Sequence, residues 1–125
     1  MARILIIDDS KTTRMVLRSA LESAGHEIVG EATNGLEGYD MYFNLHPDLT
    51  TMDVTMPLVD GIACAEKIKT HDKDARILMI SANAQAQVVV DAAALGIDKH
   101  ITKPISPALL TNTINAMMSQ AEHPE

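Results

Sequence analysis

Five polar residues with complementary chemistry follow short apolar runs at separate points of the chain. They are two adjacent acids, a third acid, a hydroxyl and an amine: Asp8, Asp9, Asp53, Ser81 and Lys103. Three carboxylates brought together destabilise one another unless a cation neutralises them. Their oxygens, with room left for water, suit Mg²⁺. The three aspartates, Mg²⁺ and Lys103 together carry no net charge, and such a site could receive an anionic phosphoryl group.

Each of these residues stands at the carboxyl end of a predicted β-strand. The strands are expected at residues 4–7, 27–32, 49–52, 76–80 and 99–102. The first, Ile4–Ile7, is a continuous apolar run, which is typical of a strand covered on both faces. Thr50 and Thr51 make the third strand unusually polar, and hydrogen bonds to neighbouring backbone are the one account that the sequence offers for them. Neighbours on a regular strand point to opposite faces, so Asp8 and Asp9 can share a site only if their strand has already ended.

Helical patterns fill the intervals between these strands. In the first interval six residues share one helical face: Thr13, Val16, Leu17, Ala20, Leu21 and Ala24. Ser10 is the expected N-cap of this helix and Gly25 lies at its end. Asn34 and Glu37 form a capping-box-like start to the second helix. Further helices are expected at residues 61–70, at 84–95 and from 107 onward.

This alternation of strand and helix, repeated five times, predicts an α/β fold. It implies a parallel sheet with helices on both faces and right-handed crossovers. In such sheets ligands bind at the carboxyl ends of the strands, where the strand order reverses. The five polar residues are therefore expected to meet at one edge of the sheet.

The bulk composition limits the classes of function. A length of 125 residues fits one domain, and the net charge of −7 opposes contact with nucleic acid or with anionic lipid. The single cysteine, Cys64, lies in a helical pattern and is expected to be a buried or half-buried thiol and not a reactive one. The absence of a signal peptide and of a long apolar segment predicts a cytoplasmic protein without membrane insertion.

The motifs around these residues resemble the receiver domain of two-component response regulators, most closely the stand-alone regulators of the chemotaxis type. The matching motifs are ILIIDDS (residues 4–10), GHEIVGEATNGLEG (25–38), PDLTTMDVTMPLVDG (47–61), ARILMISAN (75–83) and ITKPIS (101–106). Their combination is specific, whereas any one of them alone would be weak. The resemblance covers almost the whole chain and implies the flavodoxin-like receiver fold, a five-stranded sheet of order 2-1-3-4-5.

The resemblance also implies a role for each acid. Asp53 would be the phosphoacceptor, which attacks a phosphohistidine of a partner kinase to form an acyl phosphate. Asp9 would bind Mg²⁺ directly and Asp8 would hold a metal-bound water. Asp53 and the backbone carbonyl of Thr55 would complete the ligands that the protein supplies.

Further implied roles concern the response to phosphorylation. Ser81 would donate its hydroxyl to one phosphoryl oxygen and Lys103 would pair with another, with a cis bond between Lys103 and Pro104. Members of the family usually carry an aromatic residue three positions before the lysine, whose ring turns inward on activation, but this chain has His100 there. A neutral imidazole could take that switch role, or His100 could be a plain surface residue. The readout surface would be formed by the fourth helix, the fifth strand and the fifth helix.

These implications predict a signalling phosphoacceptor that assists its own phosphorylation and dephosphorylation, not an enzyme with a substrate of its own. We expect a single receiver domain over residues 1–125, with no output domain, that acts as a monomer. The expected partners are a sensor histidine kinase or a histidine phosphotransfer protein, and a downstream protein such as a motor component or a relay protein.

Two other classes of function share parts of this pattern. A Mg²⁺-dependent phosphatase with an aspartyl nucleophile is the alternative, but that class places its nucleophile and acid as D-x-D after the first strand. Here the acids Asp8 and Asp9 are adjacent and the expected nucleophile follows the third strand. A flavin-binding domain of similar fold would need aromatic residues around the ring and a Ser/Thr/Gly loop after the first strand, and the chain offers neither.

Overall fold

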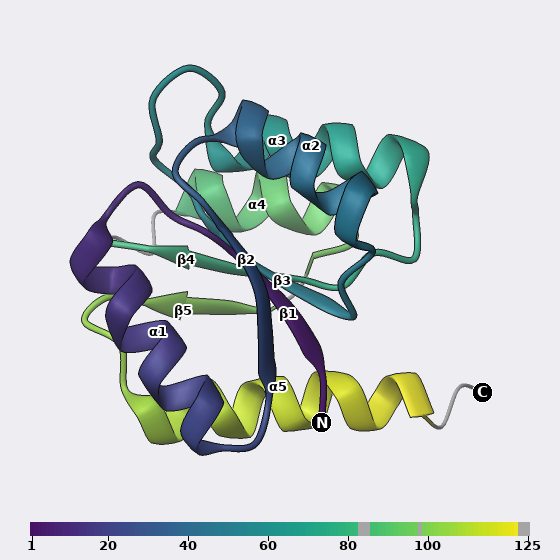
Figure 1. Cartoon of the computed structure of the whole chain (residues 1–125). Helices are drawn as coiled ribbons and strands as arrows, with labels where there is room; N and C mark the ends of the chain where they lie inside the picture. The colour runs from purple at the N-terminus through teal and green to yellow at the C-terminus, as the bar shows by residue number, and fades with distance from the viewer. Residues whose placement is uncertain (83–85, 98, 123–125) are drawn as a thin grey trace.

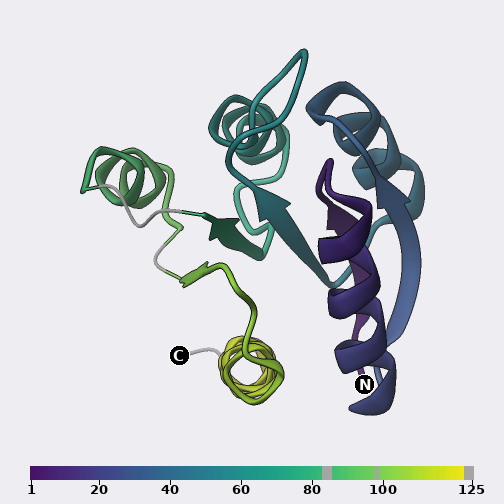
Figure 2. The ribbon, with the colours of Figure 1, turned by 90° about the vertical axis from the view of Figure 1, so that its left-hand side faces the viewer.

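Five parallel strands form the centre of the structure, a computed structural model that describes residues 1–82, 86–97 and 99–122. The elements are β1 (Arg3–Ile7), α1 (Lys11–Ser23), β2 (Glu27–Ala32), α2 (Gly35–Leu45), β3 (Leu49–Asp53), α3 (Gly61–His71), β4 (Ile77–Ser81), α4 (Ala86–Ala94), β5 (His100–Thr102) and α5 (Pro107–Glu122). The strand order is β2-β1-β3-β4-β5, as predicted. The helices α1 and α5 cover one face of the sheet, and α2, α3 and α4 cover the other (Figures 1 and 2).

The alternation of side chains along β1 divides the core between these two faces. Ile4 and Ile6 pack with residues of α1 and α5, whereas Leu5 and Ile7 pack with residues of α2, α3 and α4. All four side chains are fully buried. The predicted strand with two covered faces is therefore confirmed, and β1 anchors both halves of the core.

Local hydrogen bonds place the first two helices as the sequence predicts. The hydroxyl of Ser10 accepts a bond from the backbone N–H of Thr13 at 3.2 Å. The side chain of Asn34 accepts from the N–H of Glu37 at 2.9 Å, and the Glu37 carboxylate accepts from the N–H of Thr33 at 2.8 Å. The bonds to Thr13 and Glu37 satisfy N–H groups that the first turn of a helix leaves unpaired, and the bond to Thr33 ties the residue before the N-cap to α2.

Element boundaries depart from the prediction by single residues. Strand β1 begins at Arg3, β3 includes Asp53, β4 runs from Ile77 to Ser81 and β5 begins at His100. Hydrogen bonds to neighbouring strands, not hydropathy alone, determine where a strand ends. The expected start of the fourth helix at Ala84 lies outside the described residues.

The predicted apolar face of α1 is only partly buried. Leu17 and Leu21 are fully buried, but Val16 is 39% exposed and Ala24 is exposed as well. Val16 borders an open groove of about 760 Å³ between α1 and α5. The outer part of the helix stripe therefore faces this groove instead of the sheet.

The single cysteine lies inside the core, as predicted. Cys64 on α3 is fully buried, and its thiol donates to the backbone carbonyl of Gly35 at 3.3 Å. Burial raises the pKa of this thiol to about 11, so it stays protonated at neutral pH.

Among the described helices, none combines the length and hydropathy needed to cross a membrane.

The two threonines of β3 differ from expectation. Thr50 and Thr51 are buried, yet neither hydroxyl has a hydrogen-bond partner among the described residues. In the register of the sheet, Thr50 lies between Leu5 and Ile77. The expected bonds to neighbouring backbone are therefore absent, and each hydroxyl loses its bonds to water without replacement.

We predict that Thr50→Val and Thr51→Val each raise the free energy of unfolding, by roughly 0.5–2 kcal/mol, because valine has the same shape and no group to desolvate. Urea denaturation measures the effect. Thr70→Val is the matched control, because Thr70 on α3 is exposed and donates to the carbonyl of Glu66 at 2.8 Å. This control should gain no stability. A loss of stability in both β3 variants would contradict the unpaired state of their hydroxyls.

Candidate functional site

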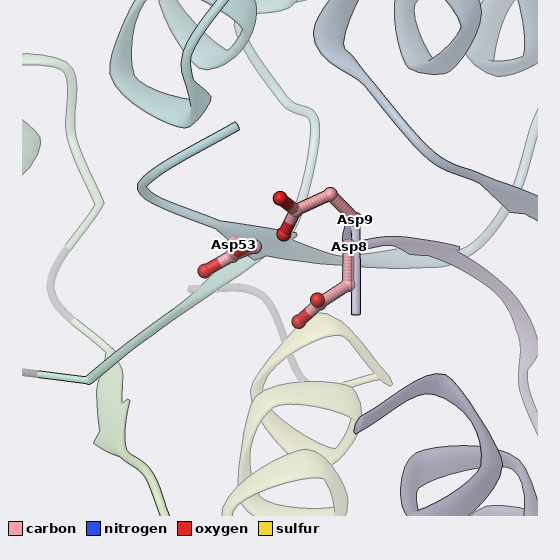
Figure 3. Close-up of side chains that lie close together, drawn as sticks. All are labelled: Asp8, Asp9 and Asp53. Carbon is pink, nitrogen blue, oxygen red and sulfur yellow. The ribbon is translucent and has the colours of Figure 1, made fainter. Parts of the chain in front are cut away.

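Three carboxylates meet at the carboxyl ends of β1 and β3. Strand β1 ends at Ile7, so Asp8 and Asp9 lie in the following loop and are free of strand alternation. Asp53 is the last residue of β3. Each acid offers an oxygen within 4.8 Å of the others, and Figure 3 shows the three side chains at the same edge of the sheet. Asp8 and Asp53 are buried, whereas Asp9 is exposed.

Hydrogen bonds fix the backbone of Asp8 and one of its two carboxylate oxygens. Its N–H donates to the carbonyl of Ala32 at 3.0 Å, and its Oδ1 accepts from the N–H of Ser10 at 2.8 Å. Arg14 donates to the Asp8 carbonyl at 2.8 Å and pairs with Glu31 on β2 at 3.1 Å. These contacts join α1 and β2 to the acidic loop, and the sequence did not reveal the roles of Arg14 and Glu31.

Lys103 forms ion pairs with both buried acids. Its Nζ lies 3.3 Å from Oδ2 of Asp8 and 3.5 Å from Oδ1 of Asp53. Its backbone N–H donates to the carbonyl of Ser81 at 2.7 Å, and the Lys103–Pro104 bond is cis, as the family resemblance implies. The structure therefore brings the three acids and the lysine together.

The electrostatic balance of the cluster appears in the pKa of Asp53. Burial of the carboxyl and then the charge of Asp8 raise this pKa from its ordinary value to about 7. The charge of Lys103 lowers the pKa, and Asp9 raises it through a hydrogen bond and through its own charge. One ammonium therefore does not offset three acids. A second cation at the cluster would favour the ionised carboxylate.

The donor set fits Mg²⁺. Oδ2 of Asp8 is buried and, apart from its ion pair with Lys103, accepts no hydrogen bond from the described part of the chain. The cluster offers carboxylate oxygens only, and one of its acids, Asp9, faces solvent, so water could complete the coordination. Thr55 lies exposed in the loop two residues after Asp53, and the role of its carbonyl as a ligand stays a prediction.

The loop that follows Asp53 packs tightly against a glycine. A Cβ atom on Gly61, the first residue of α3, would overlap the carbonyl oxygen of Asp53. The N–H of Gly61 also donates to the carbonyl of Val54 at 2.8 Å. Only glycine lets α3 begin this close to the acid. The sequence signal for this contact is Gly61 itself, at which the sequence predicts only the start of a helix.

Ser81 and His100 are joined in a way that the sequence did not predict. Ser81 ends β4, one residue beyond Ile80, which pairs with Asp53 in the sheet register. Its hydroxyl is buried and lies 2.8 Å from Nε2 of His100 on β5. His100 is half-buried, and its switch role stays a prediction.

Known proteins share this fold and this sequence pattern. The model of the response regulator receiver domain matches residues 4–115. The chain is 40% identical to the chemotaxis protein CheY of Thermotoga maritima over 90% of this chain and 94% of that protein. It is 41% identical to the chemotaxis protein CheY of Bacillus subtilis, over 94% and 98% of the two chains.

A solved structure agrees with these relatives. The crystal structure of the CheX–CheY–BeF3–Mg²⁺ complex from Borrelia burgdorferi contains a chain that superposes with a TM-score of 0.89 at 36% identity, over 93% of this chain and 88% of that one. Fold and acidic cluster thus define a CheY-like receiver domain, a class of signalling proteins. The chain belongs to the family of response regulator receiver domains.

We predict that Asp53→Asn stabilises the metal-free protein at neutral pH. The folded state holds a proton on Asp53 up to about pH 7, whereas an unfolded chain releases it near its ordinary pKa. This residue therefore contributes stability at acidic pH that is lost as the pH rises toward 7. The variant should match wild type near pH 4 and exceed it increasingly as the pH rises, by up to about 4 kcal/mol above pH 7.

Urea denaturation in the presence of a chelator, repeated across this pH range, measures the difference. Asp60→Asn is the control, because Asp60 is an exposed helix cap outside the cluster and asparagine caps equally well. Its stability relative to wild type should not vary with pH. An Asp53→Asn profile that is equally flat would disprove the electrostatic strain in the cluster.

Proposed function

We propose that the protein is a phosphoacceptor whose Asp53 takes a phosphoryl group from the phosphohistidine of a sensor histidine kinase or a histidine phosphotransfer protein. The single observation that supports this best is the placement of Asp53: it is buried, 3.5 Å from Lys103, and within 4.8 Å of two further acids. A carboxylate oxygen of Asp53 attacks phosphorus in line while the phosphorus–nitrogen bond of the donor breaks.

The residues around Asp53 neutralise different parts of the phosphoryl group's negative charge. Asp8, Asp9, Asp53 and the carbonyl of Thr55 would hold Mg²⁺, which supplies positive charge against the phosphoryl oxygens when it is bound. Lys103 pairs with one phosphoryl oxygen, and the hydroxyl of Ser81 donates to another. Because these contacts form only around the transferred group, the protein assists its own phosphorylation and dephosphorylation and has no substrate of its own.

Phosphorylation is proposed to change a protein-interaction surface on α4, β5 and α5. The new phosphoryl oxygens attract Ser81 at the end of β4 and Lys103 after β5. This attraction shifts the equilibrium between two conformations of that surface. The partner that reads it would be a motor component or a relay protein, since relatives are chemotaxis proteins. We propose that the protein acts as a cytoplasmic monomer and binds no nucleic acid.

We predict that Mg²⁺ and acetyl phosphate add one phosphoryl group to the protein, and that the modification is labile to alkali and hydroxylamine, as expected for an acyl phosphate. Intact-protein mass spectrometry and peptide mapping measure its mass and position. Asp53→Asn should abolish it, and Asp60→Asn should leave it unchanged because Asp60 lies outside the cluster. Steady multiple turnover of a small phosphorylated metabolite would instead favour an aspartyl-nucleophile phosphatase.

A further inference from the structure

The hydrogen bond between Ser81 and His100 carries an inference that rests on the proposed function. Its two atoms lie 2.8 Å apart, and they come from neighbouring strands of the sheet. In the register of β4 and β5, His100 pairs with Met79 and Ser81 pairs with Thr102. Ser81 and His100 are therefore diagonal neighbours on the same face, the face that α4 covers.

The donor count of serine decides the direction of this bond in the phosphorylated state. A hydroxyl has one hydrogen to donate and lone pairs with which to accept. If Ser81 donates that hydrogen to a phosphoryl oxygen on Asp53, it can only accept from His100. Nε2 of His100 must then carry a hydrogen, because a bare Nε2 would place two lone pairs against each other.

We propose that His100 is a positioning residue that acts through its Nε2–H. The ring donates to the Ser81 oxygen, which aims the Ser81 hydrogen at the phosphoryl group. Phosphorylation of Asp53 thereby selects the form of His100 that carries a hydrogen on Nε2. The hydrogen bond of this nitrogen, and not the packing of the ring, then couples β5 to the phosphorylation of Asp53.

The surroundings of His100 allow an effect of its Nε2–H to be distinguished from an effect of the packing of its ring. The ring borders a cavity of about 170 Å³ between α4 and β5, with an apolar wall formed by Val88, Val89, Ala92 and Ala93 of α4 and by Ile97. Lys99 is the one charged residue among those that line it. An inward-turning ring could fill this apolar space without any nitrogen, as the aromatic residue usual in the family would do. A donor to Ser81 needs the nitrogen and not the ring.

Two substitutions at position 100 distinguish the accounts. In His100→Gln the side-chain amide can donate to Ser81 from about the place of Nε2, but the ring is absent. In His100→Phe the ring is kept and the donor is lost. We expect His100→Phe to weaken the binding of beryllofluoride, a phosphoryl analogue, in the presence of Mg²⁺ by roughly tenfold, the effect of one lost hydrogen bond, whereas His100→Gln should stay close to wild type.

The direct readout is the nitrogen spectrum of the full chain labelled with ¹⁵N-histidine. With Mg²⁺ and beryllofluoride, Nε2 of His100 should show the resonance of a protonated ring nitrogen, and His100→Phe assigns the signal by its disappearance. An unprotonated Nε2 in the bound protein would overturn the inference. The reverse order of the variants, with phenylalanine tolerated and glutamine defective, would overturn it as well.

The same experiment separates this inference from the proposed function. Binding of beryllofluoride at Asp53 is followed, on a sample labelled uniformly with ¹⁵N, by the backbone amide signals of residues 53–55, with Asp53→Asn as the variant that cannot respond. If wild type binds the analogue and Nε2 stays unprotonated, the inference is wrong and the phosphoacceptor role stands. If wild type and Asp53→Asn both fail to respond, the phosphoacceptor role fails and the inference falls with it.

Discussion

Mutual repulsion among three carboxylates at one edge of the sheet is the constraint on which the rest of the site depends. Asp8 and Asp53 are buried, and one ammonium, that of Lys103, contacts both. Burial and then the charge of Asp8 raise the pKa of Asp53 to about 7, and the charge of Lys103 offsets only part of this effect. A fold would not keep such a cluster for stability, because removing an acid relieves it. The strain is useful only where a cation and an anionic group are to be received together.

The parallel sheet makes this concentration of charge possible. Asp8 follows β1 and Asp53 ends the adjacent strand β3, while Ser81 ends β4 and Lys103 follows β5, the next two strands across the sheet. The crossovers return every strand in the same direction, so residues far apart in sequence end at one edge. Support comes from elsewhere: Arg14 and Glu31 fix the acidic loop from α1 and β2. A rigid core therefore holds together a site whose carboxylates repel one another.

Much of this arrangement could be predicted from the sequence. Periodicity and caps placed the described helices, and strand ends identified the acids and Lys103, because both depend on neighbours along the chain. Contacts across the fold could not be predicted in that way. The bond between Ser81 and His100 depends on the register of β4 and β5. The hydroxyls of Thr50 and Thr51 find no partner in the described part of the chain, which depends on what surrounds β3. The exposure of Val16 depends on the groove between α1 and α5, which a pattern along one helix does not reveal.

The central claim is that a divalent cation binds where the three acids meet. Titration with Mn²⁺, a paramagnetic ion with the same preference for oxygen ligands, locates the binding site by broadening nearby amide signals. We expect the signals of residues 8–10 and 53–55 to broaden first and together, and an excess of Mg²⁺ to restore them. Broadening that begins at other acidic residues, such as Glu22 on the outside of α1, or that is absent from both loops, would contradict the account.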